Sequence, residues 1–159
     1  MTDRRRRLAY GLALGTPVAL LGGALIAQYV FGLPPCEMCW WQRYPHIAAL
    51  VLACAGWATR RDPLIALAAL GIVISGLIGG YHAGVEYGWW EGPSHCTGFA
   101  LGDDPLASIM NAPLVRCDVP AWTLAGVSLA GFNFLISIAA GLGILALLRR
   151  GPEPREALA

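Results

Sequence analysis

Four long apolar stretches constrain the fold of this chain more than any other feature. They cover about residues 8–31, 40–58, 64–87 and 121–148, and charged, polar or proline residues bound each of them. A helix of about 20 residues crosses the hydrocarbon core of a bilayer, at about 1.5 Å per residue. The purely apolar part of the second stretch, Tyr44 to Trp57, is short, and the stretch spans a bilayer only if its helix begins near Cys39. Because 57% of the residues are hydrophobic and 13% are charged, we expect an all-α membrane protein, a four-helix transmembrane bundle that forms a single domain over residues 1–159.

The arginines indicate how such a bundle is oriented. Nine of the eleven lie before the first stretch, between the second and third, or after the fourth. Positive charge is retained on the cytoplasmic side of a membrane, so we expect both termini to be cytoplasmic. The two loops on the other side, about residues 32–43 and 88–120, contain four of the five cysteines: Cys36, Cys39, Cys96 and Cys117. An even number of thiols in an oxidising compartment is what disulfide chemistry requires.

The Cys-x-x-Cys pair in the first of these loops has the features of a reactive centre. Cys39 lies at the expected start of the second helix, where free backbone N–H groups and the helix dipole favour a thiolate. Arg43 follows one helical turn later on the same face. The pair alone leaves a structural disulfide or half of a zinc site as alternatives. Cys54 lies about four turns further along, and we expect it to be a small buried side chain without a chemical role.

Two ionisable residues occur near the outer end of the third stretch. His82 and Glu86 are four residues apart and therefore share a helix face. Ionisable groups at membrane depth are costly, which makes both of them functional candidates. The alternative is that both side chains reach the interface and bind water.

Glycines at four-residue spacing predict close helix packing in two stretches. The third stretch carries Gly76, Gly80 and Gly84, and the first carries Gly11 and Gly15. Small residues at this spacing let the backbones of neighbouring helices approach.

The second outer loop is long enough to be functional in its own right. It contains Cys96 and Cys117, and between them Asp104 and Pro105 form a helix-start signal ahead of apolar residues that share one side. We expect a short interfacial helix over 104–110, lying on the membrane surface.

Three interpretations of the four outer cysteines compete at this point. A structural zinc site normally uses two Cys-x-x-Cys hairpins, and the second pair here is widely split, so we expect no metal site. Two static disulfides in a membrane scaffold would leave Arg43 and His82 without a role. In the third interpretation the loop pair exchanges with a soluble thiol protein and passes oxidation on through mixed disulfides.

The order of these motifs resembles the DsbB family of quinone-linked membrane thiol oxidases. The resemblance is carried by Cys36-Glu-Met-Cys39-Trp-Trp-Gln-Arg43, then Tyr81-His82-Ala-Gly-Val-Glu86, then Cys96, then Cys117-Asp118-Val-Pro120-Ala-Trp122, and it covers nearly the whole chain. The vitamin K epoxide reductase family also has four spans and two cysteine pairs. In that family the loop pair precedes the Cys-x-x-Cys, so the order here favours DsbB.

The resemblance implies a bacterial inner-membrane enzyme, a protein-disulfide-generating quinone reductase. Its partner would be a periplasmic thioredoxin-fold disulfide donor of the DsbA type, and its electron acceptor would be ubiquinone or menaquinone. No nucleic-acid partner is expected.

The resemblance also implies a role for each site residue. Cys96 would form the mixed disulfide with the partner, Cys117 would attack Cys36, and Cys39 would face the quinone. The residues implied to form the quinone site are Arg43, His82 and Glu86.

Overall fold

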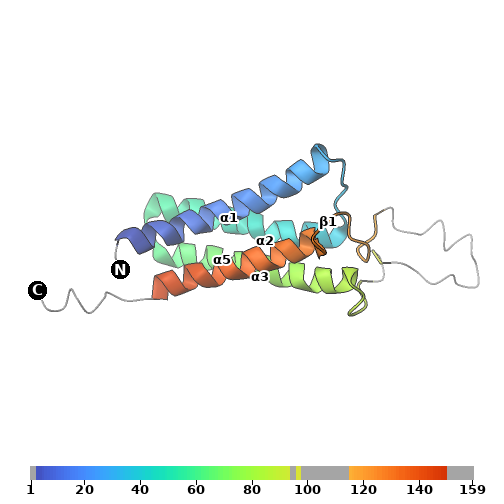
Figure 1. Cartoon of the computed structure of the whole chain (residues 1–159). Coiled ribbons are helices and arrows are strands. Elements are labelled where there is room, and N and C mark those ends of the chain that lie inside the picture. Colours follow the sequence, from blue (N-terminus) through green and yellow to red (C-terminus); the bar gives the residue numbers. More distant parts are fainter. Residues whose placement is uncertain (1–2, 94–95, 98–114, 150–159) are drawn as a thin grey trace, which may run out of the picture.

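The structure is a computed structural model of the chain, and it describes residues 3–93, 96–97 and 115–149. Four long helices lie side by side in an elongated bundle (Figure 1): α1 (Asp3–Tyr29), α2 (Glu37–Thr59), α3 (Asp62–Glu86) and α5 (Leu129–Arg149). Two short strands, β1 (Thr123–Leu124) and β2 (Val127–Ser128), pair in antiparallel fashion just before α5.

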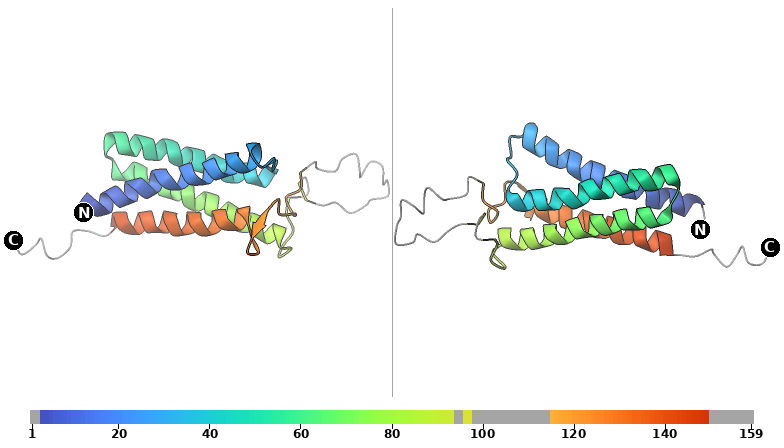
Figure 2. Two further views of the ribbon diagram at one scale, coloured as in Figure 1. Left: turned by 45° about the horizontal axis from the view of Figure 1, so that its top comes forward. Right: turned by 180° about the vertical axis from the view of Figure 1, so that it is seen from behind.

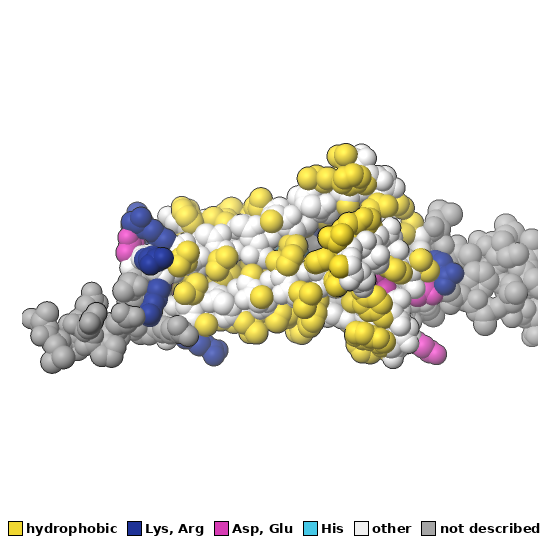
Figure 3. Space-filling model, viewed as in Figure 1, with side chains coloured by type: hydrophobic (Ala, Val, Ile, Leu, Met, Phe, Trp, Pro, Cys, Tyr) yellow, Lys and Arg dark blue, Asp and Glu magenta, His cyan; other side chains and the backbone are white. Residues whose placement is uncertain are grey.

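Three of these helices, α1, α3 and α5, are long and apolar enough to cross a membrane. The flank of the bundle is largely uncharged in the space-filling view, and charged side chains gather at its ends (Figure 3). The expected all-α membrane protein is therefore confirmed. The crossing of the membrane by α2 stays a prediction, and the interfacial helix expected over 104–110 lies outside the described residues.

The two ends of the bundle carry different groups. One end holds the start of α1, the end of α5 and the turn between α2 and α3 (Figure 2). Most of the described arginines lie at this end as well (Figure 3). At this end Arg6 and Tyr10 both donate hydrogen bonds to Asp62 Oδ1, at 2.9 and 2.7 Å, which ties α1 to the start of α3. The other end holds the connection from α1 to α2, the end of α3 and the β1–β2 hairpin.

The hairpin makes α5 start later than the expected residue 121. Ala125 and Gly126 have φ values of 51° and 80°, and two successive left-handed residues form a tight turn between strands. Tyr87 fixes this turn, because its hydroxyl accepts a hydrogen bond from Ser128 N and donates one to Gly126 O. The apolar character of residues 121–128 therefore belongs to a hairpin and not to a helix.

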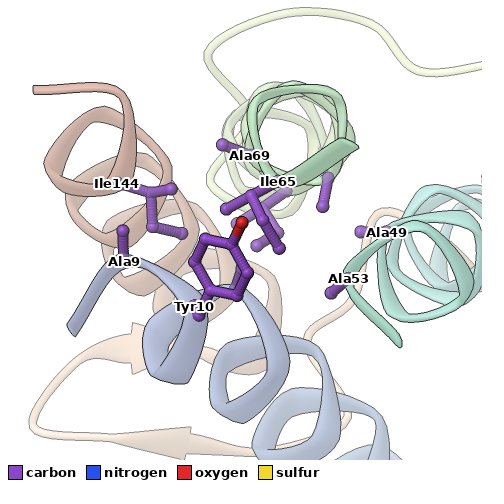
Figure 4. Close-up of a cluster of buried hydrophobic side chains, with 10 residues drawn as sticks. Ala9, Tyr10, Ala49, Ala53, Ile65, Ala69 and Ile144 are labelled. Atoms are coloured by element: carbon purple, nitrogen blue, oxygen red, sulfur yellow. The ribbon is translucent and has the colours of Figure 1, made fainter. Parts of the chain in front are cut away.

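The core of the bundle is built from small side chains of all four helices. Tyr10 of α1 points into a cluster that includes Ala49 and Ala53 of α2, Ile65 and Ala69 of α3, and Ile144 of α5 (Figure 4). Alanines allow the helix axes to come close, so packing contacts stabilise the bundle where lipid supplies no hydrophobic driving force.

The glycines of α3 confirm one of the two packing predictions. A Cβ atom at Gly76 would press on Ser137 and Ile138 of α5, one at Gly80 would press on the Phe134 ring, and one at Gly84 would collide with the Trp90 ring. The prediction for α1 is not met by the described residues, since a Cβ atom at Gly11 or Gly15 would have no described neighbour within 4 Å.

Candidate redox site

The Cys-x-x-Cys pair lies at the N-terminus of α2. Pro34 and Pro35 precede it and cannot continue a helix, so the chain turns and α2 begins at Glu37 with Cys36 as its N-cap. The Cys39 backbone N–H donates to Cys36 Sγ at 3.3 Å, and the Cys36 thiol donates to Cys39 Sγ at 2.9 Å. Both cysteines are free thiols, held in contact with each other.

The pair is electrostatically asymmetric. The hydrogen bond to Cys39, and then burial, raise the pKa of the Cys36 thiol far above its ordinary value. Cys36 therefore keeps its proton, and negative charge on the pair belongs to Cys39. The first turn of α2 suits this charge, because its unpaired N–H groups carry partial positive charge.

The second cysteine pair forms a disulfide between Cys96 and Cys117. Cys36, Cys96 and Cys117 are all buried in one cluster with Met38 and Val85, and Cys39 packs against the same cluster. The fold thus brings together two cysteine pairs that lie far apart in the sequence. Their proximity is what thiol–disulfide exchange between them requires.

His82 and Glu86 lie on the Cys36 side of this cluster. His82 Nε2 is 3.6 Å from Cys36 Sγ and 3.7 Å from Glu86 Oε1, and the ring also faces the Cys117 backbone. Gln42 Nε2 lies 2.8 Å from His82 Nδ1. Both predicted residues are buried here, so they do not simply reach the interface.

A cavity of about 200 Å³ lies on the Cys39 side, between α1 and the first turns of α2 and α5. Most of its wall residues are apolar, chiefly alanines, leucines and prolines. Its polar wall residues are Cys39, Gln42, Arg43, His46 and Asn133. His82 and Glu86 do not line it, so their contact with a quinone stays a prediction.

Arg43 places a buried positive charge on this cavity. Its side chain is 8% exposed, and it donates to Gln28 Oε1 at 2.7 Å and stacks over the Trp40 ring, 4.8 Å from the ring centroid. Within the described part of the chain, no carboxylate lies within ion-pair distance of Arg43. A guanidinium beside a thiolate and apolar walls fits a flat, apolar ring with carbonyl acceptors, as a quinone has.

The thiols and the imidazole also form a compact group of potential metal ligands. Ligand atoms of Cys36, Cys39 and His82 all lie within 4.8 Å of one another. The disulfide removes Cys96 and Cys117 from any four-thiolate zinc site.

Comparison with known proteins identifies the family of the chain. The sequence profile of the family described as "Disulfide bond formation protein DsbB" matches residues 6–147, almost the whole chain. The chain belongs to the DsbB family. Three similar relatives, each named "Disulfide bond formation protein B", come from Verminephrobacter eiseniae, Polaromonas naphthalenivorans and Acidovorax sp..

These relatives are similar to the chain along most of its length. The identities are 33%, 30% and 31%, and each alignment covers 94% of this chain and 89%, 95% and 90% of the respective relative. No solved structure matches the chain. The resemblance to the DsbB family is therefore confirmed, and the chain is a disulfide-generating oxidoreductase of this family.

Sequence reasoning missed some of the polar residues at the site and misjudged one cysteine. Gln42, His46 and Asn133 line the cavity and were not predicted, although a polar residue within an apolar stretch is a signal that could have identified them. The expectation that Cys54 is buried is wrong, because its side chain is exposed on the surface of α2.

Proposed function

We propose that this DsbB family protein relays electrons from the Cys96/Cys117 pair to the Cys36/Cys39 pair and on to a membrane quinone. The electron source is a reduced periplasmic protein of the thioredoxin fold, like DsbA. In this proposal all four long helices, including α2, cross the bacterial inner membrane. Both termini are cytoplasmic, and both cysteine pairs are on the periplasmic side.

One observation carries the proposal. Cys36 is buried in the same cluster as the Cys96–Cys117 disulfide, while its partner Cys39 lines the cavity that holds Arg43. The Cys-x-x-Cys pair therefore has one sulfur towards a disulfide and the other towards an apolar cavity. A pair of purely structural disulfides requires neither the cavity nor the buried cation.

The first half of the relay is exchange with the soluble partner. A partner thiolate attacks Cys96, and Cys117 leaves as a thiolate. The second partner thiolate then attacks the partner sulfur of this mixed disulfide, and Cys96 leaves, so the partner gains a disulfide and the loop pair gains two thiols. The two electrons that the partner loses now reside on Cys96 and Cys117.

The second half passes these electrons inward. The Cys117 thiolate attacks Cys36 of the oxidised inner pair, and Cys39 leaves as a thiolate. Cys96 then attacks Cys117, which restores the loop disulfide and releases Cys36. Cys36 takes up a proton, in agreement with its raised pKa.

The cavity residues suit an acceptor that is dissolved in the membrane. A bound quinone supplies a two-electron, two-proton acceptor at this position. Arg43 would hold it through the guanidinium N–H groups and would stabilise the Cys39 thiolate by charge. An oxidising acceptor is necessary because a DsbA-like partner is itself a strong oxidant, near about −120 mV.

The test is turnover with a reduced partner. Purified protein in detergent is mixed with a reduced DsbA-like protein and either a ubiquinone or a menaquinone analogue, and the loss of partner thiols is followed. We expect catalytic oxidation by the wild type and by Cys54→Ala, and none by Cys39→Ser. Turnover by the Cys39→Ser variant would contradict the proposal. A scaffold with structural disulfides predicts no turnover in any variant and lower thermal stability after Cys36 and Cys39 are replaced.

A further inference from the structure

Five buried polar side chains meet in the middle of the bundle, next to the cavity. They come from three helices and are Gln42 and His46 of α2, Ser75 of α3, and Asn133 and Ser137 of α5. Polar groups are expensive in the interior of a membrane protein, so a connected group of them calls for a functional explanation.

Backbone carbonyls determine how the two amides of this network are oriented. Gln42 Nε2 donates to Met38 O at 3.1 Å, which leaves Gln42 Oε1 as an acceptor. Asn133 Nδ2 donates to that Oε1 at 2.9 Å and to Ser75 O at 3.1 Å. A carbonyl oxygen can only accept, so Asn133 Oδ1 must be the atom that faces His46.

The orientation of Asn133 in turn determines the tautomer of His46. Asn133 Oδ1 accepts from Ser137 Oγ at 2.9 Å and lies 3.0 Å from His46 Nε2, so Nε2 carries the hydrogen. Burial among neutral groups favours the uncharged imidazole. Its other nitrogen, Nδ1, is then a bare acceptor.

This acceptor has no partner within the described part of the chain. His46 is 3% exposed, its Nδ1 is buried without a hydrogen bond, and the residue lines the same cavity as Cys39 and Arg43. A purely structural histidine in this network would have both nitrogens satisfied, because a polar atom that is buried without a hydrogen bond keeps the full cost of its desolvation. The unpaired atom therefore points to a ligand that offers a hydrogen-bond donor.

We propose that His46 is a ligand-binding residue of the cavity and that its Nδ1 accepts a hydrogen bond from the hydroxyl of a reduced quinone. This inference rests on the proposed function. An oxidised quinone ring offers only carbonyl acceptors, which Arg43 can bind and His46 Nδ1 cannot. A hydroquinone offers O–H donors, so the His46 wall of the cavity distinguishes the two redox forms.

The preference has a consequence for electron flow. Tighter binding of the hydroquinone makes the bound quinone a stronger oxidant than the free one. A tenfold preference corresponds to about 30 mV for a two-electron couple. The network of Gln42, Asn133 and Ser137 would hold His46 in one tautomer. By this means it would favour electron transfer from Cys39 to the bound quinone.

The test measures binding and not turnover. Protein with both cysteine pairs oxidised is titrated anaerobically with a short-chain ubiquinone, its hydroquinone and the dimethyl ether of that hydroquinone, and each Kd is obtained by equilibrium dialysis. We expect wild-type protein to bind the hydroquinone about tenfold more tightly than the dimethyl ether, as one hydrogen bond in a buried site would give. This comparison needs no variant and is unaffected by folding defects.

Substitutions at His46 supply the second arm. His46→Leu should weaken hydroquinone binding about five- to tenfold and quinone binding less than about twofold, since it removes one acceptor. His46→Asn should restore part of the loss, because its amide oxygen can occupy the position of Nδ1. Equal weakening of both redox forms, or equal wild-type affinity for hydroquinone and ether, would overturn the inference and leave the proposed function intact. Failure of wild-type protein to bind either redox form would overturn the proposed function as well.

Discussion

The surroundings of Arg43 indicate its role more directly than those of any other site residue. It is a buried cation on a cavity wall, its described contacts are neutral, and its neighbour on that wall is Cys39. A charge in this setting is costly unless it stabilises negative charge nearby.

We expect Arg43→Ala to raise the quinone KM at least about tenfold. Arg43 is the only guanidinium among the described residues that line the cavity, and one charged hydrogen bond is worth about 1.5–3 kcal/mol. The rate of thiol exchange with the soluble partner should change much less. Steady-state kinetics at varied quinone concentration and at varied partner concentration separate the two effects. Arg43→Lys is the matched control, because it keeps the charge and should fall between wild type and Arg43→Ala. Equal effects on both substrates would contradict the position of Arg43 at the acceptor.

His82 lies on the other side of the cysteine pair and leads to a different prediction. Its Nε2 is 3.6 Å from Cys36 Sγ, and it does not line the cavity. We expect His82→Ala to slow electron transfer from the loop pair to the inner pair by about tenfold or more, as loss of a residue that positions a reacting sulfur would. The quinone KM should stay within about twofold of the wild-type value, because the cavity wall is unchanged.

Rapid mixing with reduced partner, followed by acid trapping of thiols, measures the rate of electron transfer between the two cysteine pairs. A large rise in quinone KM with normal transfer would instead support the role implied by family resemblance.

At the scale of the helices, close packing of α3 against α5 positions the site. Gly141 of α5 contacts the backbone of α3, since a Cβ atom there would lie 3.1 Å from Ala69 O and 2.5 Å from Val73 Cγ2. Gly143 on the same helix has no described neighbour within 4 Å of its Cβ position.

The two glycines of α5 form a matched pair for testing this packing. Gly141→Leu should lower the free energy of unfolding by about 1–3 kcal/mol, because the added side chain forces the helices apart. Gly143→Leu should leave stability within about 0.5 kcal/mol of wild type. Thermal unfolding in detergent measures both variants. Equal stability of the two would mean that α3 and α5 are not in the described contact.

Sequence reasoning predicted the positions of the helices well, but it predicted only some of the contacts between them. Gly76, Gly80 and Gly84 mark a packed face, as predicted, while Gly11 and Gly15 have the same spacing and meet no described neighbour. The spacing of small residues indicates that another helix could pack closely against this face. It does not indicate whether such a helix is present. The start of α5 was missed for a related reason: residues 121–128 are apolar enough for a span, and only the left-handed Ala125 and Gly126 reveal the turn.

The same limit applied to the site. Residue spacing predicted the Cys36/Cys39 pair and Arg43 at the start of a helix, because those relations are local. The approach of Cys96 and Cys117 to Cys36, and the contact between His46 and Asn133, depend on how distant helices pack. No local pattern encodes such contacts.

At the scale of the whole molecule, charge divides the two ends of the bundle. Most described arginines lie at the end opposite the cysteine pairs (Figures 1 and 3). The positive-inside rule supports the proposed orientation, in which this end is cytoplasmic and the cysteine end is periplasmic.

The orientation can be measured in cells. A fluorescent protein fused after the C-terminus should fold and fluoresce, because it remains in the cytoplasm. A single cysteine placed at the exposed Glu91, in a protein whose five native cysteines are replaced by serine, should react with a membrane-impermeant maleimide added outside intact spheroplasts. Labelling that appears only after permeabilisation would reverse the proposed orientation.

In the proposed relay, electrons from both cysteine pairs leave the protein through Cys39, and this route can be checked by counting the electrons that reach the quinone. Fully reduced Cys54→Ala protein is mixed anaerobically with excess quinone, and the quinone consumed is measured from its ultraviolet absorbance. Each dithiol supplies two electrons, so we predict about two equivalents of quinone reduced per protein, and about one when Cys96 and Cys117 are both serine. Adding Cys39→Ser to the Cys54→Ala protein should give none, although its loop dithiol is intact. Quinone reduction by that Cys39→Ser protein at the same stoichiometry would contradict the account.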